Sequence, residues 1–153
     1  MIHDSSIKEL PCGFSFIELG ESDSYPHFVY LSGDRLYTEV DRTLHVYSSG
    51  ELTSPSATYP LEDYKTCYSA LISDNRLYLG GEKQLHIFEV TPSLTEPLTP
   101  VSKIPTKGGI LKILRVGDDL LLGSDYGYLE VFDLKNSNIT STHEFGENIT
   151  DNY

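Results

Sequence analysis

The sequence predicts an all-β fold in which about three similar units, each of four short antiparallel strands, follow one another. The composition favours strands, because aromatic and β-branched residues are common in sheets and the 153 residues include 11 Tyr and 6 Phe. The 12 Gly and 8 Pro interrupt the chain often, as many short strands require. No long stretch has the apolar spacing of a helix.

An internal repeat is the third observation. The triplet Arg-Leu-Tyr occurs at residues 35 and 76, which are 41 positions apart. The quartets Leu-His-Val-Tyr at 44 and Leu-His-Ile-Phe at 85 keep the same offset of 41 positions. Two motifs with one offset are much harder to obtain by chance than either motif alone. A third copy follows, in which Leu129 lies 44 positions after Leu85.

The first unit comes after a lead-in that is difficult to interpret. Residues 14–19 alternate in hydrophobicity enough for one short strand. The unit itself has turn residues at 32–34 and 41–43, where Gly and Asp tolerate the backbone angles of a tight turn. Its expected strands are residues 28–31, 35–40, 44–47 and, after a Pro-marked stretch, 57–59.

The second and third units repeat this scheme. In the second unit we expect strands at 68–72, 76–80, 85–90 and 101–104, with a turn at 81–84. In the third we expect strands at 110–116, 120–123, 128–133 and 139–145, with turns at 117–119 and 124–127. Residues 147–153 look like the lead-in to another unit.

A period of 40–45 residues with four strands per repeat is typical of β-propeller blades. Residues 123–133, Gly-Ser-Asp-Tyr-Gly-Tyr-Leu-Glu-Val-Phe-Asp, resemble the end of a WD-repeat blade. The resemblance covers roughly residues 28–145 and is strongest in the third unit. Phe132, Phe88 and Tyr47 stand where the family usually has Trp, and no Gly-His pair precedes any unit. A divergent WD-repeat-like propeller fits best; quinoprotein-like repeats are the alternative family.

Three blades leave a ring open, because propellers close with 4–8 blades and each repeat buries its apolar faces only against neighbours. We therefore expect a fragment of a larger propeller, or a ring completed by another chain, and the end at Tyr153 favours truncation. The expected domains are a lead-in at 1–27, able to add one strand to a neighbouring blade, and a partial propeller at 28–153. Its units are about 28–64, 65–109 and 110–153. The structural alternative is a small antiparallel sandwich or barrel of about ten strands.

The formal charge of −12 constrains the partners. It repels nucleic acid and anionic membrane and attracts a basic protein surface, although its ordinary effect is solubility. The first residues lack the pattern of a signal peptide, and no segment is apolar enough to span a membrane, so we expect a cytoplasmic, intracellular protein. Cys12 and Cys67 are too few for a disulfide framework or a zinc knuckle.

No residue is assigned a catalytic, cofactor-binding or metal-binding role. His45 and His86 are equivalent by repeat, so ring geometry holds them apart and packing or hydrogen bonding is their expected role. The glycine pairs at 80–81 and 108–109 are interpreted as turn and bulge residues rather than a phosphate-binding loop.

The acidic and basic residues near the turns have structural interpretations. Asp34, Asp74, Asp118 and Asp119 lie between first and second strands and are expected to form turns. Asp125 is expected in a turn and Asp133 at a strand end. The equivalent Arg35 and Arg76 either face a partner or pair with the acidic turn beside them. No nucleophile motif such as Gly-x-Ser-x-Gly occurs, and Cys67 lies in no local signature.

The leading functional hypothesis is a non-catalytic scaffold for protein–protein interaction. It rests on the resemblance, since WD-repeat-like propellers typically present one rim and a loop-built face to peptides or partner subunits. We expect no enzyme activity and no cofactor. The alternatives are a quinoprotein-like or other enzymatic propeller fragment, and a truncated product with no independent function.

Overall fold

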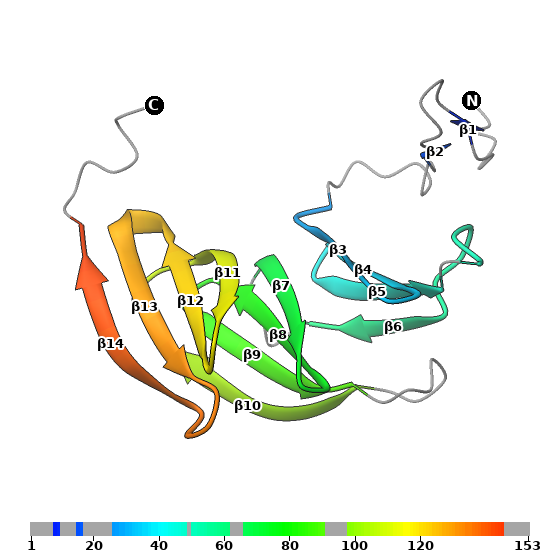
Figure 1. Cartoon of the computed structure of the whole chain (residues 1–153). Coiled ribbons are helices and arrows are strands. Elements are labelled where there is room, and N and C mark those ends of the chain that lie inside the picture. Colours follow the sequence, from blue (N-terminus) through cyan, green and yellow to red (C-terminus); the bar gives the residue numbers. More distant parts are fainter. Residues whose placement is uncertain are drawn as a thin grey trace.

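Three four-stranded antiparallel sheets follow one another along the chain in the computed structural model (Figure 1). The structure describes residues 26–48, 50–61, 66–90 and 98–145, and the short strands β1 (Lys8–Glu9) and β2 (Ser15–Phe16), which pair with each other. Blade 1 contains β3 (Val29–Ser32), β4 (Arg35–Val40), β5 (Thr43–Ser48) and β6 (Ala57–Pro60). Blade 2 contains β7 (Cys67–Ser73), β8 (Arg76–Gly81), β9 (Gln84–Glu89) and β10 (Thr99–Pro105). Blade 3 contains β11 (Ile110–Val116), β12 (Asp119–Ser124), β13 (Tyr128–Asp133) and β14 (Asn138–Glu144).

This architecture confirms the predicted all-β fold with three four-stranded antiparallel blades. Strand order within each blade follows the sequence, so each blade is a meander whose fourth strand, β6, β10 or β14, lies on the outside of the arc (Figure 1). The sandwich or barrel alternative is wrong, because the described strands of residues 29–144 form three successive four-stranded sheets that are arranged as blades along an arc (Figure 1). The exact boundaries of the units, and the assignment of residues 1–27 to a neighbouring blade, stay predictions.

The local predictions need corrections at the ends of the strands. Four residues predicted in turns belong to strands: Ser32 to β3, Thr43 to β5, Gln84 to β9 and Ser124 to β12. Gly81 belongs to β8 rather than to the following turn, which consists of Glu82 and Lys83, with Lys83 at φ +61°. Asp119 belongs to β12, where it pairs with Val116. The strand β1 has no counterpart in the sequence prediction. Cys12 and residues 147–153 lie outside the described residues, so the predictions about them are not addressed.

Gly80 explains why β8 runs so close to its neighbours. It lies opposite Ser69 beside a register shift in β7, between Cys67 and Ser69. A Cβ atom at Gly80 would lie 2.2 Å from the Ser69 Oγ and 2.7 Å from the Ile110 Cγ2 of blade 3. This glycine therefore permits a close approach between blades and does not form a turn.

Alternation along the strands sends apolar side chains to both faces of blade 2. In β8, Leu77 and Leu79 pack toward blade 1, while Tyr78 between them packs toward blade 3. The buried side chains of the 1–2 interface are Tyr37, Leu44, Val46, Leu61, Cys67, Leu77, Leu79 and Phe88. Those of the 2–3 interface are Tyr78, Leu85, Ile87, Ile110, Ile113, Leu120, Leu122 and Phe132. The core therefore lies between the blades, as stacked repeats require.

The two outer blades each keep one apolar face exposed. On blade 3, Leu114 lies opposite Leu121 on the face away from blade 2 and is 58% exposed. On blade 1, Leu31 lies opposite Leu36 on the face away from blade 2 and is 64% exposed. In blade 2 the position equivalent to Leu114 is Leu71, opposite Tyr78, and Leu71 packs into the 2–3 interface. The exposed faces are therefore those that a further blade would cover.

Candidate interaction surface

A polar cleft opens between blades 1 and 2 at the end where the first and second strands of each blade are joined. We call it the 1–2 cleft; its volume is about 370 Å³. It is lined by Ser32, Asp34, Arg35 and Tyr37 of blade 1 and by Ile72, Asn75 and Val90 of blade 2. Gly33, in the turn beside it, has φ +59°, a conformation that suits glycine. The cleft thus combines a carboxylate, two hydroxyls, an amide and a guanidinium with two aliphatic side chains.

The Tyr37 hydroxyl is the buried polar group of this cleft. Tyr37 is 1% exposed, and among the described residues no hydrogen bond of regular geometry reaches its Oη, although the Arg35 guanidinium lies close enough for a weak one. Burial raises the pKa of Tyr37, and the nearby Arg35 guanidinium opposes that rise. A buried hydroxyl without a well-formed hydrogen bond is costly, so a ligand atom that hydrogen bonds to Oη would recover that free energy.

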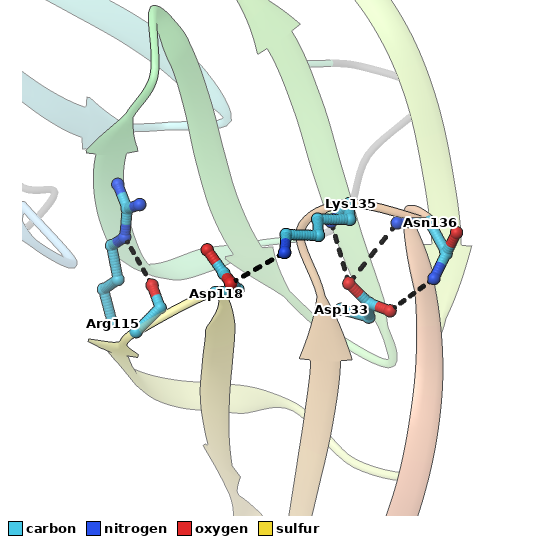
Figure 2. A network of polar contacts seen from close by, with 6 residues as sticks. Arg115, Asp118, Asp133, Lys135 and Asn136 are labelled. Atoms are coloured by element: carbon cyan, nitrogen blue, oxygen red, sulfur yellow. Dashed lines mark hydrogen bonds and ion pairs between the residues drawn. The ribbon is translucent and has the colours of Figure 1, made fainter.

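The equivalent space between blades 2 and 3, which we call the 2–3 cleft, contains Arg115 of β11, whose side chain is 40% exposed. Its Nη1 donates to the Ser73 Oγ at 2.5 Å and lies 3.3 Å from the Asp74 Oδ2. Its Nε donates to the Gly117 carbonyl at 3.0 Å, a contact drawn in Figure 2. Arg115 lies opposite Leu120 in β12, just as Ile72 lies opposite Leu77 in β8. One register position therefore holds arginine in one cleft and isoleucine in the other.

Polar contacts continue along the turns of blade 3 (Figure 2). The Lys135 Nζ lies 3.1 Å from the Asp118 Oδ2, and this carboxylate raises the pKa of Lys135. Asp133 accepts hydrogen bonds from the Lys135 backbone N–H at 2.8 Å and from the Asn136 Nδ2 at 2.7 Å. The Asn136 side-chain hydrogen bond is the main cause of the lowered pKa of Asp133. Asp133 therefore ends β13 and holds the next turn, as expected for a strand-end residue.

A second hollow of about 410 Å³ lies at the other end of blades 2 and 3 and is lined by Lys83, Lys107, Tyr126, Tyr128 and Glu144. Tyr126 belongs to the short 3-10 turn η1 (Asp125–Gly127), has φ +60° and is 69% exposed. In the same turn the Asp125 Oδ1 accepts a hydrogen bond from the Gly109 N–H at 2.6 Å. Asp125 is thus a turn residue, as predicted, and it also ties that turn to the loop before β11.

His45, His86 and Glu130 occupy equivalent positions in the third strands of the three blades. His45 stacks on Tyr47 with their ring centroids 6.2 Å apart. His86 is 2% exposed, and burial, with a smaller effect from Lys103, lowers its pKa to about 4. The Glu130 Oε2 accepts a hydrogen bond from the Lys107 backbone N–H at 3.1 Å. Within the described ranges, no three His, Cys, Asp or Glu side chains gather closely enough to hold a metal ion.

Cys67 and Glu39 lie inside the 1–2 interface. Cys67 is a fully buried cysteine, and burial, with a contribution from Glu39, raises its thiol pKa to about 12. Glu39 is also fully buried, and its carboxylate accepts a hydrogen bond from the Arg42 N–H at 2.6 Å and contacts the His27 Nδ1 at 2.5 Å. These groups are satisfied inside the protein, so they belong to the interior and not to a reactive site.

Solved structures share this arrangement of blades. A chain of the mitotic checkpoint complex is 14% identical over 88% of this chain, with a TM-score of 0.70. The WD40 repeats of RRP9 are 12% identical over 82% of it, with a TM-score of 0.68. The fold is that of a WD-repeat-like propeller. A computationally designed protein, Ika8, is also similar, at 12% identity over 90% of the chain and a TM-score of 0.64.

These similarities show the fold alone. The chain spans about two fifths of each of these structures: 44% of the mitotic checkpoint complex chain, 40% of the RRP9 chain and 42% of the Ika8 chain. No protein-family model matches the sequence, and no curated protein matches it. Among the described residues of the propeller, no helix is long and apolar enough to cross a membrane.

The residues that form the 1–2 cleft were only partly anticipated. Asp34 and Arg35 were singled out from the sequence, and they do lie together in the cleft. Asp74, in the acidic turn of blade 2, pairs with Arg115 of the next blade, and no pattern in the sequence indicates this contact. Tyr37 and Ile72 were not singled out either. An alignment of the first strands of the units would have shown that Ile72 and Arg115 share a position.

Proposed function

We propose that this chain is a non-catalytic interaction scaffold that binds a basic segment of a partner protein. The observation that carries the proposal is the 1–2 cleft, an open polar hollow between two blades with a buried Tyr37 hydroxyl that no hydrogen bond of regular geometry reaches among the described residues. Pockets with a few convergent polar groups and aliphatic walls are typical of sites for a ligand or a partner's side chain. Because the fold repeats the same blade three times, it places equivalent strand ends and turns side by side on one framework.

The charge of the chain indicates the sign of the partner. With a formal charge of −12, the protein attracts a Lys- or Arg-rich segment and repels polyanions. Acidic side chains stand in the turns between first and second strands, among them Asp34, Asp74 and Asp118. Such exposed charges speed association and contribute a salt-dependent part of the affinity.

The exposed apolar faces of blades 1 and 3 bear on the assembly in which the scaffold works. Leu31 and Leu114 are more than half exposed on faces that resemble the buried faces of blade 2. We propose that further blades, from this or another polypeptide, cover these faces. A cytoplasmic location, expected from the sequence, is part of the same proposal.

Binding of a lysine–glycine peptide to the full chain tests the proposed function. We expect calorimetry to show binding at about 0.05 M salt that weakens severalfold at about 0.3 M, because screening shortens the range of the acidic field. A glutamate–glycine peptide of the same length is the control and should not bind. Equal binding of the two peptides, or affinity that does not depend on salt, would contradict the proposal of a basic partner.

A further inference from the structure

The 2–3 cleft shows which side chain fits a cleft of this type. There the Arg115 guanidinium contacts the Ser73 Oγ, the Asp74 carboxylate and the Gly117 carbonyl. The same position of blade 2 is Ile72, so no arginine of the chain enters the 1–2 cleft from β7. We propose that the 1–2 cleft binds an arginine side chain of a partner protein, in the place that Arg115 takes between blades 2 and 3.

The acceptors that Arg115 uses have counterparts in the 1–2 cleft. Ser32 lies opposite Arg35 as Ser73 lies opposite Arg76, so the two serines share one register position. Gly33 takes the place of Asp74, and the carboxylate of the next residue, Asp34, lines the cleft instead. A hydroxyl and a carboxylate are therefore present for an incoming guanidinium, as they are between blades 2 and 3.

The Tyr37 hydroxyl supplies a third acceptor. It is buried and lines the cleft, and among the described residues only the Arg35 guanidinium lies beside it, without a hydrogen bond of regular geometry, so a well-directed guanidinium N–H would satisfy Oη. Guanidinium suits this site better than ammonium because its planar fork has five donors that reach several acceptors at once. Ile72 and Val90 line the same cleft and can contact the aliphatic stem of the arginine.

Arg35 also lines the cleft, and its positive charge is the strongest argument against a second guanidinium. The 2–3 cleft nevertheless contains two arginines, because Arg76 occupies there the position that Arg35 has in the 1–2 cleft. Both Arg76 and Arg115 act electrostatically on the hydroxyl of Tyr78, so both guanidinium groups lie near that one tyrosine. Two arginines therefore share the equivalent space within this same protein.

This inference deepens the proposed function and relies on it for the claim that the arginine belongs to a protein. Its own test uses a small probe, N-acetyl-arginine amide, titrated into the full chain and followed by NMR. We expect saturable shifts at the backbone amides of Ser32, Ile72 and Asn75. The matched citrulline derivative, which has the same shape without the charge, should bind about tenfold more weakly, because charge-assisted hydrogen bonds are the stronger ones.

Two variants test the equivalence of the clefts. Ile72→Arg supplies the missing arginine from within the chain and should abolish the shifts caused by the probe, whereas Ile72→Leu should keep them. Arg115→Ile should empty the 2–3 cleft and add a second set of shifts at Ser73 and Asp118. Both variants are compared with the unmodified chain by their NMR spectra, so that a loss of binding is separated from a loss of folding.

Three results would overturn the inference: equal binding of the arginine and citrulline probes, shifts caused by N-acetyl-glutamate amide instead of the arginine probe, or binding that Ile72→Arg leaves intact. The glutamate result would identify Arg35 as an anchor for a carboxylate. The lysine–glycine peptide separates the two proposals. If this peptide binds to the unmodified chain while the arginine probe does not, the 1–2 cleft assignment fails and the scaffold function stands.

Discussion

The 1–2 and 2–3 interfaces use the same strand positions but differ at several of them, including three that carry an ionisable side chain in at least one interface. Glu39 of blade 1 is replaced by Gly80 of blade 2, Ile72 is replaced by Arg115, and His86 is replaced by Glu130. Most apolar positions around them keep their character, so each interface has a cluster of buried apolar side chains. The repeated apolar positions therefore determine the fold. A few polar substitutions give each interface between blades a different set of charged and hydrogen-bonding groups.

The largest expected effect comes from removing an aromatic side chain of the 2–3 interface. Phe132 is fully buried, and its ring centroid lies 6.0 Å from that of Tyr78. Phe132→Ala should lower the free energy of unfolding by about 3–5 kcal/mol, because the cavity loses both apolar burial and packing contacts. Urea unfolding followed by circular dichroism measures this change.

The matched control is Phe145→Ala, since Phe145 is 62% exposed and should change stability by less than about 0.5 kcal/mol. Phe88→Ala removes the equivalent ring of the 1–2 interface and should cost nearly as much as Phe132→Ala. If Phe132→Ala cost less than about 1 kcal/mol, the 2–3 interface would not have the packed core described above.

A second effect distinguishes the interfaces by pH. Because the pKa of His86 is lowered to about 4 in the folded protein, the unfolded chain, with an ordinary histidine pKa near 6.5, takes up the proton first. The neutral His86 side chain makes its full contribution to the free energy of unfolding above pH about 6.5. This contribution is lost as the pH falls toward 4, and the total loss is about 3 kcal/mol. Unfolding measured at pH values from 7 to 5 should show most of this slope.

His86→Gln should flatten the pH dependence, because the group that titrates is gone. His143→Gln is the control, since His143 is exposed on the outer strand of blade 3. A slope that persists unchanged in His86→Gln would show that other groups cause the acid sensitivity.

The smallest of the stability effects concerns the close approach at Gly80. Gly80→Ala should cost about 2 kcal/mol, because the new methyl group overlaps the Ser69 Oγ and the Ile110 side chain. Gly50→Ala, at a glycine with no heavy atom within 4 Å of its would-be Cβ, should be nearly neutral. Thermal unfolding measures both, and equal melting temperatures would mean that blades 2 and 3 separate slightly to admit the methyl group at little cost.

The fold was accessible from the sequence because the apolar alternation and the turn residues recur with a nearly constant offset. That regularity gave every blade strand to within a few residues, and β13 at both of its ends. Gly81 was misassigned to a turn because the shift in register of β7 opposite β8 leaves no local trace in the sequence.

The candidate site was less accessible, since it depends on contacts between blades. Asp34 and Arg35 could be singled out because they are adjacent in the sequence. The buried position of the Tyr37 hydroxyl, in contrast, results from the packing of two blades and cannot be inferred from one unit. Likewise, Arg115 crosses from blade 3 to the turn of blade 2, and no pattern within one unit predicts a contact to the next.

The reactivity of Cys67 can report how often the 1–2 interface opens. With its pKa raised to about 12, the thiol is almost never a thiolate at neutral pH, and complete burial keeps reagents away from it. With Cys12→Ser removing the other cysteine, an alkylating reagent can modify the chain only when blades 1 and 2 separate. The rate of thiol modification therefore reports the frequency of these openings. A partner that binds to both blades should lower this rate.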